Sequence, residues 1–128
     1  MTDQLYPQGK NHLLGKSAQI NVLTDTLKVM FYAGTYSGTH EYVSDLTGAS
    51  IVARSGALSG QVLSSGTFDA NDITLVSVSG SAFSGVIMYK DSGADASSPL
   101  TAWWDVTTFT PTGGSVTVVF NASGIFGI

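Results

Sequence analysis

Paired aspartates form the first arrangement in this sequence that could do chemistry. Asp91 and Asp95 lie four residues apart in a glycine-containing loop, which weakly resembles a calcium-binding loop. A calcium ion needs six to eight oxygen ligands and usually several carboxylates, whereas positions 96–98 hold only alanine and serine, with no closing glutamate. The acidic cluster at 69–72 fails for the same reason. We therefore expect aspartate-stabilised turns in both places and no metal site.

The two histidines are the next candidates for catalysis. His12 lies near the N-terminus, and His40 is adjacent to Glu41. However, the sequence contains neither G-x-S-x-G nor H-E-x-x-H, and its many serines single out no nucleophile. Two carboxylates that hydrolyse a glycoside would be defined only by their separation in space, but the nine acidic residues all lie near expected turns or strand ends. We expect a protein that is not an enzyme and that uses no cofactor.

Charged residues are scarce, which restricts the kinds of partner. They make up 11% of the chain, with a net charge of −4, against about 25% in a typical globular domain. The five basic residues are too few and too scattered to bind nucleic acid. The polar N-terminus lacks the apolar core of a signal peptide, and no stretch is long enough to span a membrane. A neutral polar surface costs less to desolvate than a charged one, which favours contact with other proteins.

The elements that must position these residues begin after an N-terminal arm. Residues 1–17 are expected to form this arm, because Pro7 and Gly9 interrupt regular structure. It contains one close-set apolar pair, Leu13 and Leu14. Either the arm is a flexible end, or the two leucines anchor it onto the body or onto a neighbouring subunit. Residues 18–128 are expected to form a single β domain.

Apolar and polar residues alternate along much of this domain, which predicts strands with one face on the core. In the stretch 25–34, Val29 and Phe31 face inward, whereas Met30 and Tyr32 face outward. Further strands are expected at 19–22, 51–54, 61–64, 66–69, 73–78, 86–89, 100–106 and 116–120. The continuous apolar run at 86–89 predicts a central strand covered on both faces.

Residues 39–46 are expected to form a short helical turn or an ordered loop. Turn signals recur about every ten residues, and no helix is long enough to cover a parallel sheet. The pattern therefore predicts an all-β, single-domain antiparallel β-sandwich of jelly-roll type, with an extended N-terminal arm.

Two adjacent tryptophans lie on one of the predicted strands, so their side chains point to opposite faces. With Ala102 and Trp104 inward, Trp103 faces outward. Either other parts of the protein cover it, or it serves as an oligomer contact or a carbohydrate-stacking surface. We expect an oligomer contact before a sugar site, because the nearby polar groups are mostly hydroxyls. The candidate interface residues are Leu13, Leu14, Met30, Tyr32, Trp103, Ile125, Phe126 and Ile128.

Four segments resemble a family of small virion proteins from tailed bacteriophages. They are THEYVSDLTGASIVARSGALSGQ at 39–61, GTFDANDITLVSVSG at 66–80, VIMYKDSGADASSPLTAWWD at 86–105 and TGGSVTVVFNASGIFGI at 112–128. The resemblance covers about residues 25–128, and its motifs are typical of a lineage rather than of an activity. The Trp103-Trp104 pair is a departure, since family members more often have smaller or aliphatic residues there.

The resemblance implies a structural protein of the virion. We expect a capsid cement or decoration protein that binds the major capsid protein as a homo-oligomer, either a dimer or a trimer. Its expected location is the capsid exterior, after assembly in the host cytoplasm, with no nucleic-acid or membrane partner. The alternatives are a neck, tail or fibre protein that contacts the host surface or carbohydrate, and a stand-alone carbohydrate-binding module that uses Trp103.

Overall fold

The computed structural model describes residues 4–120 and 124–127, and antiparallel sheets dominate it. The all-β prediction is confirmed, with one short helix in addition. The strands are β1 (Gln4–Leu5), β2 (Leu27–Tyr32), β3 (Ile51–Arg54), β4 (Val62–Ser64), β5 (Thr67–Asp69), β6 (Ile73–Leu75), β7 (Phe83–Lys90), β8 (Leu100–Phe109), β9 (Val116–Val118) and β10 (Phe126–Gly127). The helical elements are α1 (Pro7–Leu13) and the 3₁₀ turns η1 (Val43–Asp45), η2 (Gly48–Ser50) and η3 (Asp95–Ser97).

A five-stranded main sheet has the order β1-β8-β7-β2-β3. β7 lies at its centre, and its apolar run is buried on both faces, as the sequence predicts. Met88 of β7 pairs with Val29 on one side and with Ala102 on the other. Because both neighbours supply apolar side chains in this register, the centre of the sheet needs no polar residue.

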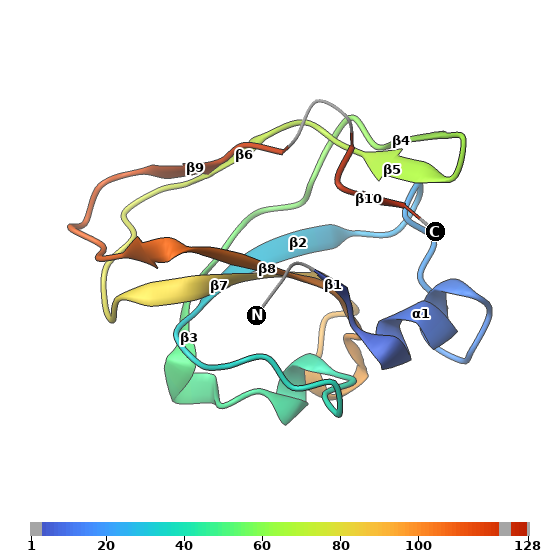
Figure 1. The fold of residues 1–128 in the computed structure, drawn as a ribbon, viewed down its shortest axis with the longest axis horizontal. Coiled ribbons are helices and arrows are strands. Elements are labelled where there is room, and N and C mark those ends of the chain that lie inside the picture. The colour runs from blue at the N-terminus through green and yellow to red at the C-terminus, as the bar shows by residue number, and fades with distance from the viewer. Residues whose placement is uncertain (1–3, 121–123, 128) are drawn as a thin grey trace.

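Two small sheets, β10-β5-β4 and β6-β9, cover one face of the main sheet (Figure 1). The larger core lies between these layers. Val29 and Phe31 contribute to it from the main sheet, and Phe68, Leu75 and Ile125 contribute from the covering side. The Phe31 and Phe83 rings stack with their centroids 4.3 Å apart. The inward face predicted for 25–34 is therefore the face that forms this core.

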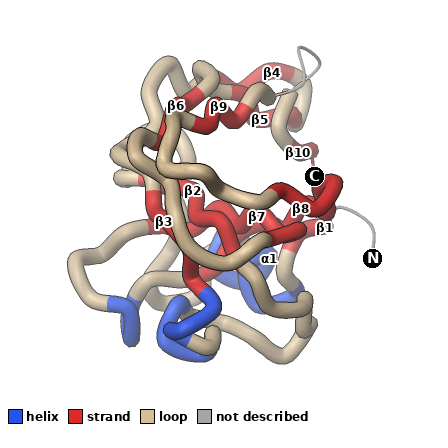
Figure 2. Tube along the Cα trace, turned by 90° about the vertical axis from the view of Figure 1, so that its left-hand side faces the viewer, coloured by secondary structure: helices blue, strands red, loops and turns tan. Residues whose placement is uncertain are grey.

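The other face of the main sheet is also covered. Figure 2 shows the helical segments gathered on the side of the main sheet opposite the small sheets. A second core lies there, and it contains Tyr6, Met30, Tyr32, Leu100 and Trp103. Strands that carry apolar residues at both even and odd positions need cover on both faces. The expectation that Met30 and Tyr32 face solvent is wrong, because α1 and the 3₁₀ turns supply that cover.

The N-terminal arm differs from the extended arm expected. Gln4–Leu5 pairs with β8, and Pro7–Leu13 is helical. Pro7 is tolerated because it occupies the start of the helix, where its missing N–H has no intrahelical partner to lose. Gly9 is buried against β8, so it serves packing rather than a chain break. None of the helices in the described part of the chain has the length and apolar character that crossing a bilayer requires.

Two further segments test the local predictions. Residues 19–22 form no strand, although Ile20 and Val22 are buried in the larger core as their spacing suggests. They reach it from a turn, in which the Asn21 carbonyl accepts a hydrogen bond from the Asp25 amide at 2.9 Å. The helical turn expected within 39–46 is present as η1, closed by the Asp45 carboxylate, which accepts hydrogen bonds from the amides of Glu41 and Tyr42.

Candidate functional site

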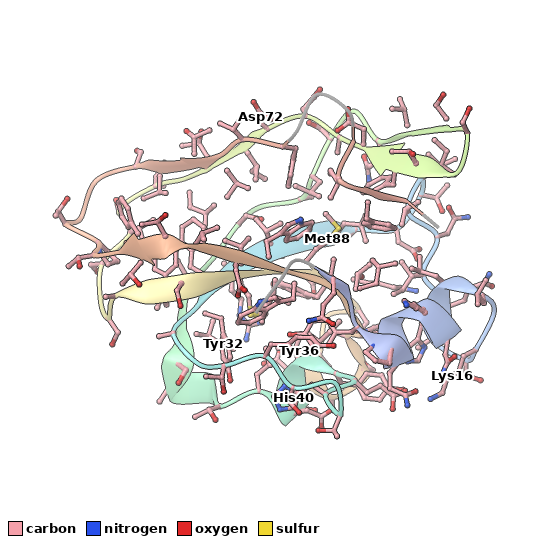
Figure 3. The ribbon with its side chains drawn as sticks, viewed as in Figure 1. Lys16, Tyr32, Tyr36, His40, Asp72 and Met88 are labelled. Atoms are coloured by element: carbon pink, nitrogen blue, oxygen red, sulfur yellow. The ribbon has the colours of Figure 1, made fainter. Side chains whose placement is uncertain are left out.

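Three of the candidate interface residues are buried within the chain itself. Met30, Tyr32 and Trp103 are at most 3% exposed. Trp103 does point away from the larger core, but the Tyr32 and Tyr36 rings cover it at centroid distances of 6.2 and 5.8 Å. Figure 3 shows both tyrosines on the side of the main sheet opposite the small sheets. These three side chains are therefore buried within the chain. Of the two alternatives for Trp103, cover by other parts of the protein is confirmed, and its place among the candidate interface residues is wrong.

Two of the other candidates come together. Leu13, which is half-buried, and Phe126 line a single groove of about 400 Å³ between the segment 19–22 and the β4–β5 hairpin. Ile125 is buried in the larger core, and Leu14 is 76% exposed. Ile128 lies outside the described residues. The arm and the C-terminal segment, which are far apart in sequence, thus contribute to the same surface.

β4 forms one wall of this groove and is unusual among the described strands, because all three of its residues are exposed. Val62 and Leu63 are 54% and 53% exposed. β4 lies at the edge of its sheet and pairs with β5 (Figure 1). We call this surface the β4 patch: the groove together with the edge strand β4, whose residues Val62 and Leu63 are exposed.

The β4 patch carries no charged side chain. The lining residues of the groove are all apolar or neutral, and the whole segment 56–68, which contains β4, is uncharged. Edge strands of soluble proteins are normally protected by lysine, proline or a bulge, because their free backbone groups pair readily with other chains. β4 has no lysine or proline, so both its side chains and its backbone suit contact with another protein.

A second exposed apolar surface lies along β9. Val106, Phe109 and Val119 line a groove of about 350 Å³ between the end of β8 and β9. Val119 is 73% exposed, and the other two are about two-fifths exposed. We call these three residues the β9 patch. In Figure 1 the β6-β9 sheet and the β4-β5 hairpin occupy different ends of the covering layer, so the two patches are separate surfaces.

Most of the charged side chains that the structure describes form ion pairs with other residues of the same chain. Among the described residues, ion pairs join Lys28 with Asp91, Arg54 with Asp95, Lys90 with Asp25, and Lys16 with Glu41. The two aspartates of the loop 91–95 therefore bind different cations from neighbouring segments. Within the described ranges, 4–120 and 124–127, no three His, Cys, Asp or Glu side chains gather at one point. Asp69 and Asp72 accept hydrogen bonds from backbone amides instead.

His12 is the titratable side chain with the most specific environment. It is fully buried, with Nδ1 2.8 Å from the Ser17 carbonyl oxygen and Nε2 2.7 Å from Oε2 of Glu41. Each ring nitrogen therefore lies within hydrogen-bonding distance of an oxygen atom from another segment of the chain. Lys16 donates to the same carboxylate oxygen at 2.7 Å (Figure 3 labels Lys16 beside α1).

This cluster clamps α1 to the segment before η1. Its geometry is that of a structural tie, since the part of the chain that the structure describes brings no nucleophile to His12. Sequence reasoning missed the pairing, because His12 and Glu41 are 29 positions apart. The only available signal was that both residues are charged or polar in a chain with very few such groups.

Acid should unfold this protein through its paired carboxylates. The pKa values of four carboxyl groups are lowered by hydrogen bonds, which come from Lys16 to Glu41, from the Tyr42 amide to Asp45, from Lys28 to Asp91 and from Arg54 to Asp95. A lowered folded-state pKa contributes stability that is present above the unfolded value, about 4, and is lost as pH falls through the folded one.

We therefore expect the urea midpoint to be level near neutral pH and to fall progressively below about pH 4. Unfolding curves recorded between neutral pH and strongly acidic pH measure this. Asp95→Asn should flatten part of the decline, because it removes one of the carboxyl groups whose pKa is lowered. A midpoint that stays constant below that pH would contradict the assignment.

Comparison with models of known protein families finds none that matches this chain, and comparison with curated proteins finds no similar sequence.

Proposed function

We propose that this chain is a structural protein of a tailed-bacteriophage virion, which binds the outside of the capsid shell as a homo-oligomer and so stabilises the shell. The resemblance of the four segments to small phage virion proteins supports the virion role. The proposed mode of action is supported by two separate apolar surfaces that are exposed and uncharged, the β4 patch and the β9 patch. A cement protein needs two such surfaces, one for its own copies and one for the shell.

The physical argument concerns desolvation and avidity. An uncharged apolar surface gains free energy when it is buried, at about 25 cal/mol per Å², and has no charge to strip of water. One contact of this kind can be weak. When two linked copies bind neighbouring shell subunits, the second contact is effectively intramolecular, and the combined binding is much tighter.

We also propose that the main sheet and the two small sheets together are a jelly-roll-like sandwich. The antiparallel pairing of all the described strands and the apolar core between the layers support this. The proposed role involves no catalysis. In support, the paired carboxylates and the buried His12 are used in holding segments of the chain together.

Quantitative mass spectrometry of purified phage particles tests the role. We expect a copy number comparable to that of the major capsid protein. We assign shell binding to the β9 patch, so Val119→Lys should lower incorporation at least tenfold, because a buried lysine must shed water without gaining an ion pair. Asn11→Lys, an equally charged change at an exposed position on α1, should be incorporated normally.

Absence of the protein from particles would refute the virion role. A copy number far below that of the shell, with density at a single vertex, would instead place it in the neck, tail or a fibre. Normal incorporation of Val119→Lys would show that the shell contact lies elsewhere on the surface.

A further inference from the structure

β4 stays largely exposed in the single folded chain. Its residues Val62 and Leu63 are each more than half exposed, and it pairs with β5 through three residue pairs. An isolated two-stranded hairpin is marginally stable in water, and this sheet gains only the two-residue β10 as its third strand. A further strand beside β4 would supply the missing backbone partners and would cover part of the exposed Leu63 side chain.

We propose that this strand is β4 of a second copy of the same chain, which forms a two-fold symmetric dimer through the β4 patch. This deepens the proposed function, since it rests on the homo-oligomer in that proposal but not on the capsid. Antiparallel pairing centred on Leu63 places Leu63 beside the same residue of the partner and Val62 opposite Ser64. The result is a continuous six-stranded sheet with the order β10-β5-β4-β4-β5-β10.

The absence of charge on the β4 patch favours a second copy of the chain as the partner. A symmetric interface brings every group close to its own copy, so any charge at its centre meets a like charge. The segment 56–68 carries none, and neither does the lining of the groove. The chain as a whole has a net charge of −4, so this neutral surface is one on which two copies can approach without repulsion.

The position of Leu63 also fits. It pairs with Phe68 across the hairpin, and residues paired across strands share a face of the sheet. Since Phe68 is 1% exposed and both residues line the groove, Leu63 points toward the groove side. In the dimer, the Leu63 side chain of the partner extends this apolar row over the groove.

Mass measurement by light scattering of the purified chain at micromolar concentration is the first test. We expect twice the chain mass for the natural sequence and a single chain mass for Leu63→Lys, which puts two lysines side by side at the symmetry axis. Val119→Lys, at a more exposed valine in the β9 patch, is the matched control and should stay dimeric. Circular dichroism of each variant checks that it is folded.

Cross-linking provides a second test that does not depend on how Leu63→Lys folds. The chain has no cysteine, so Leu63→Cys carries a single thiol. Mild oxidation should convert most of it to a covalent dimer, whereas Val76→Cys, on an exposed residue after β6 and away from the interface, should form little covalent dimer. A natural chain that is monomeric at these concentrations, a Leu63→Lys variant that is still dimeric, or a trimer would each overturn the proposal.

The two proposals fail in different experiments. A monomer that is abundant on phage particles would refute this interface and leave shell binding intact. A dimer that is absent from particles would refute shell binding and leave this interface intact.

Discussion

Replacing Trp103 with alanine should lower the free energy of unfolding by about 3–5 kcal/mol, the usual range for a buried large aromatic side chain. The indole is 2% exposed and contacts the Tyr32 and Tyr36 rings. Its Nε1–H donates a hydrogen bond to Asp105 at 2.8 Å. A Cβ atom on Gly85 would lie 2.3 Å from the indole, so the ring packs directly against the backbone of β7 at this position.

Trp104→Ala is the matched control. Trp104 is half-buried and packs at the edge of the larger core, where its ring lies 6.4 Å from that of Phe120. Urea unfolding should therefore show a smaller loss for this variant than for Trp103→Ala. A larger loss of stability for Trp104→Ala would mean that Trp104, and not Trp103, is the more deeply buried side chain.

Fluorescence tests the same burial without unfolding the protein. In Trp104→Phe, Trp103 is the single tryptophan, and its emission should be blue-shifted and resistant to acrylamide. In Trp103→Phe, the remaining indole of Trp104 should be quenched more readily. Equal quenching of the two would contradict the cover that the loop after β2 provides.

Replacing Gly9 with alanine should destabilise the protein by about 3 kcal/mol, the upper part of the usual range for overpacking. In an exposed helix this change would be stabilising by about 1 kcal/mol. Here, however, the added Cβ would lie 2.4 Å from the Leu100 carbonyl oxygen and 3.0 Å from that of Thr101. Both atoms belong to the backbone of β8, so α1 itself must move.

Such a shift would disturb the contacts that hold the arm to the body. The Tyr6 amide donates a hydrogen bond to the Thr101 carbonyl oxygen at 3.0 Å, and the Tyr6 and His12 side chains are fully buried. Burial also raises the pKa of the Tyr6 phenol above its usual range, because the surrounding protein excludes water from the phenol. Hydrogen exchange should therefore show faster opening of α1 in the Gly9→Ala variant.

Gly56→Ala is the control for the glycine change. A Cβ atom there would meet no atom within 4 Å, and its backbone conformation is open to other residues. Its urea midpoint should stay close to that of the natural chain. If Gly9→Ala were neutral or stabilising, α1 would have to lie farther from the β8 backbone than it does in the structure.

The scarcity of charge has a clearer meaning once the ion pairs are known. Lys28, Arg54 and Lys90 all pair with aspartates from other segments. The few charges therefore tie loops to the main sheet, and they leave the β4 and β9 patches neutral. Composition alone indicated a neutral surface, but it did not show where on the molecule that surface lies.

Several predictions from the sequence succeeded because they depend on local geometry. The alternation in 25–34 and the continuous apolar run at 86–89 correctly predicted β2 and the doubly buried β7. Side chains on a strand alternate between its faces whatever the rest of the chain does. The segment 19–22 was misassigned because two buried residues with a spacing of two also occur in a turn that lies against a core.

The sequence by itself determined the class of fold, the two long central strands and the side of each on which a residue lies, since these follow from the local pattern of apolar residues along the backbone. Only the tertiary structure decided what covers the second face of the main sheet, and hence that Trp103 is buried. It also decided that Leu13 and Phe126 share a groove and that His12 reaches Glu41. These outcomes depend on contacts between segments far apart in the chain, where packing rather than local pattern determines which surface stays open to a partner.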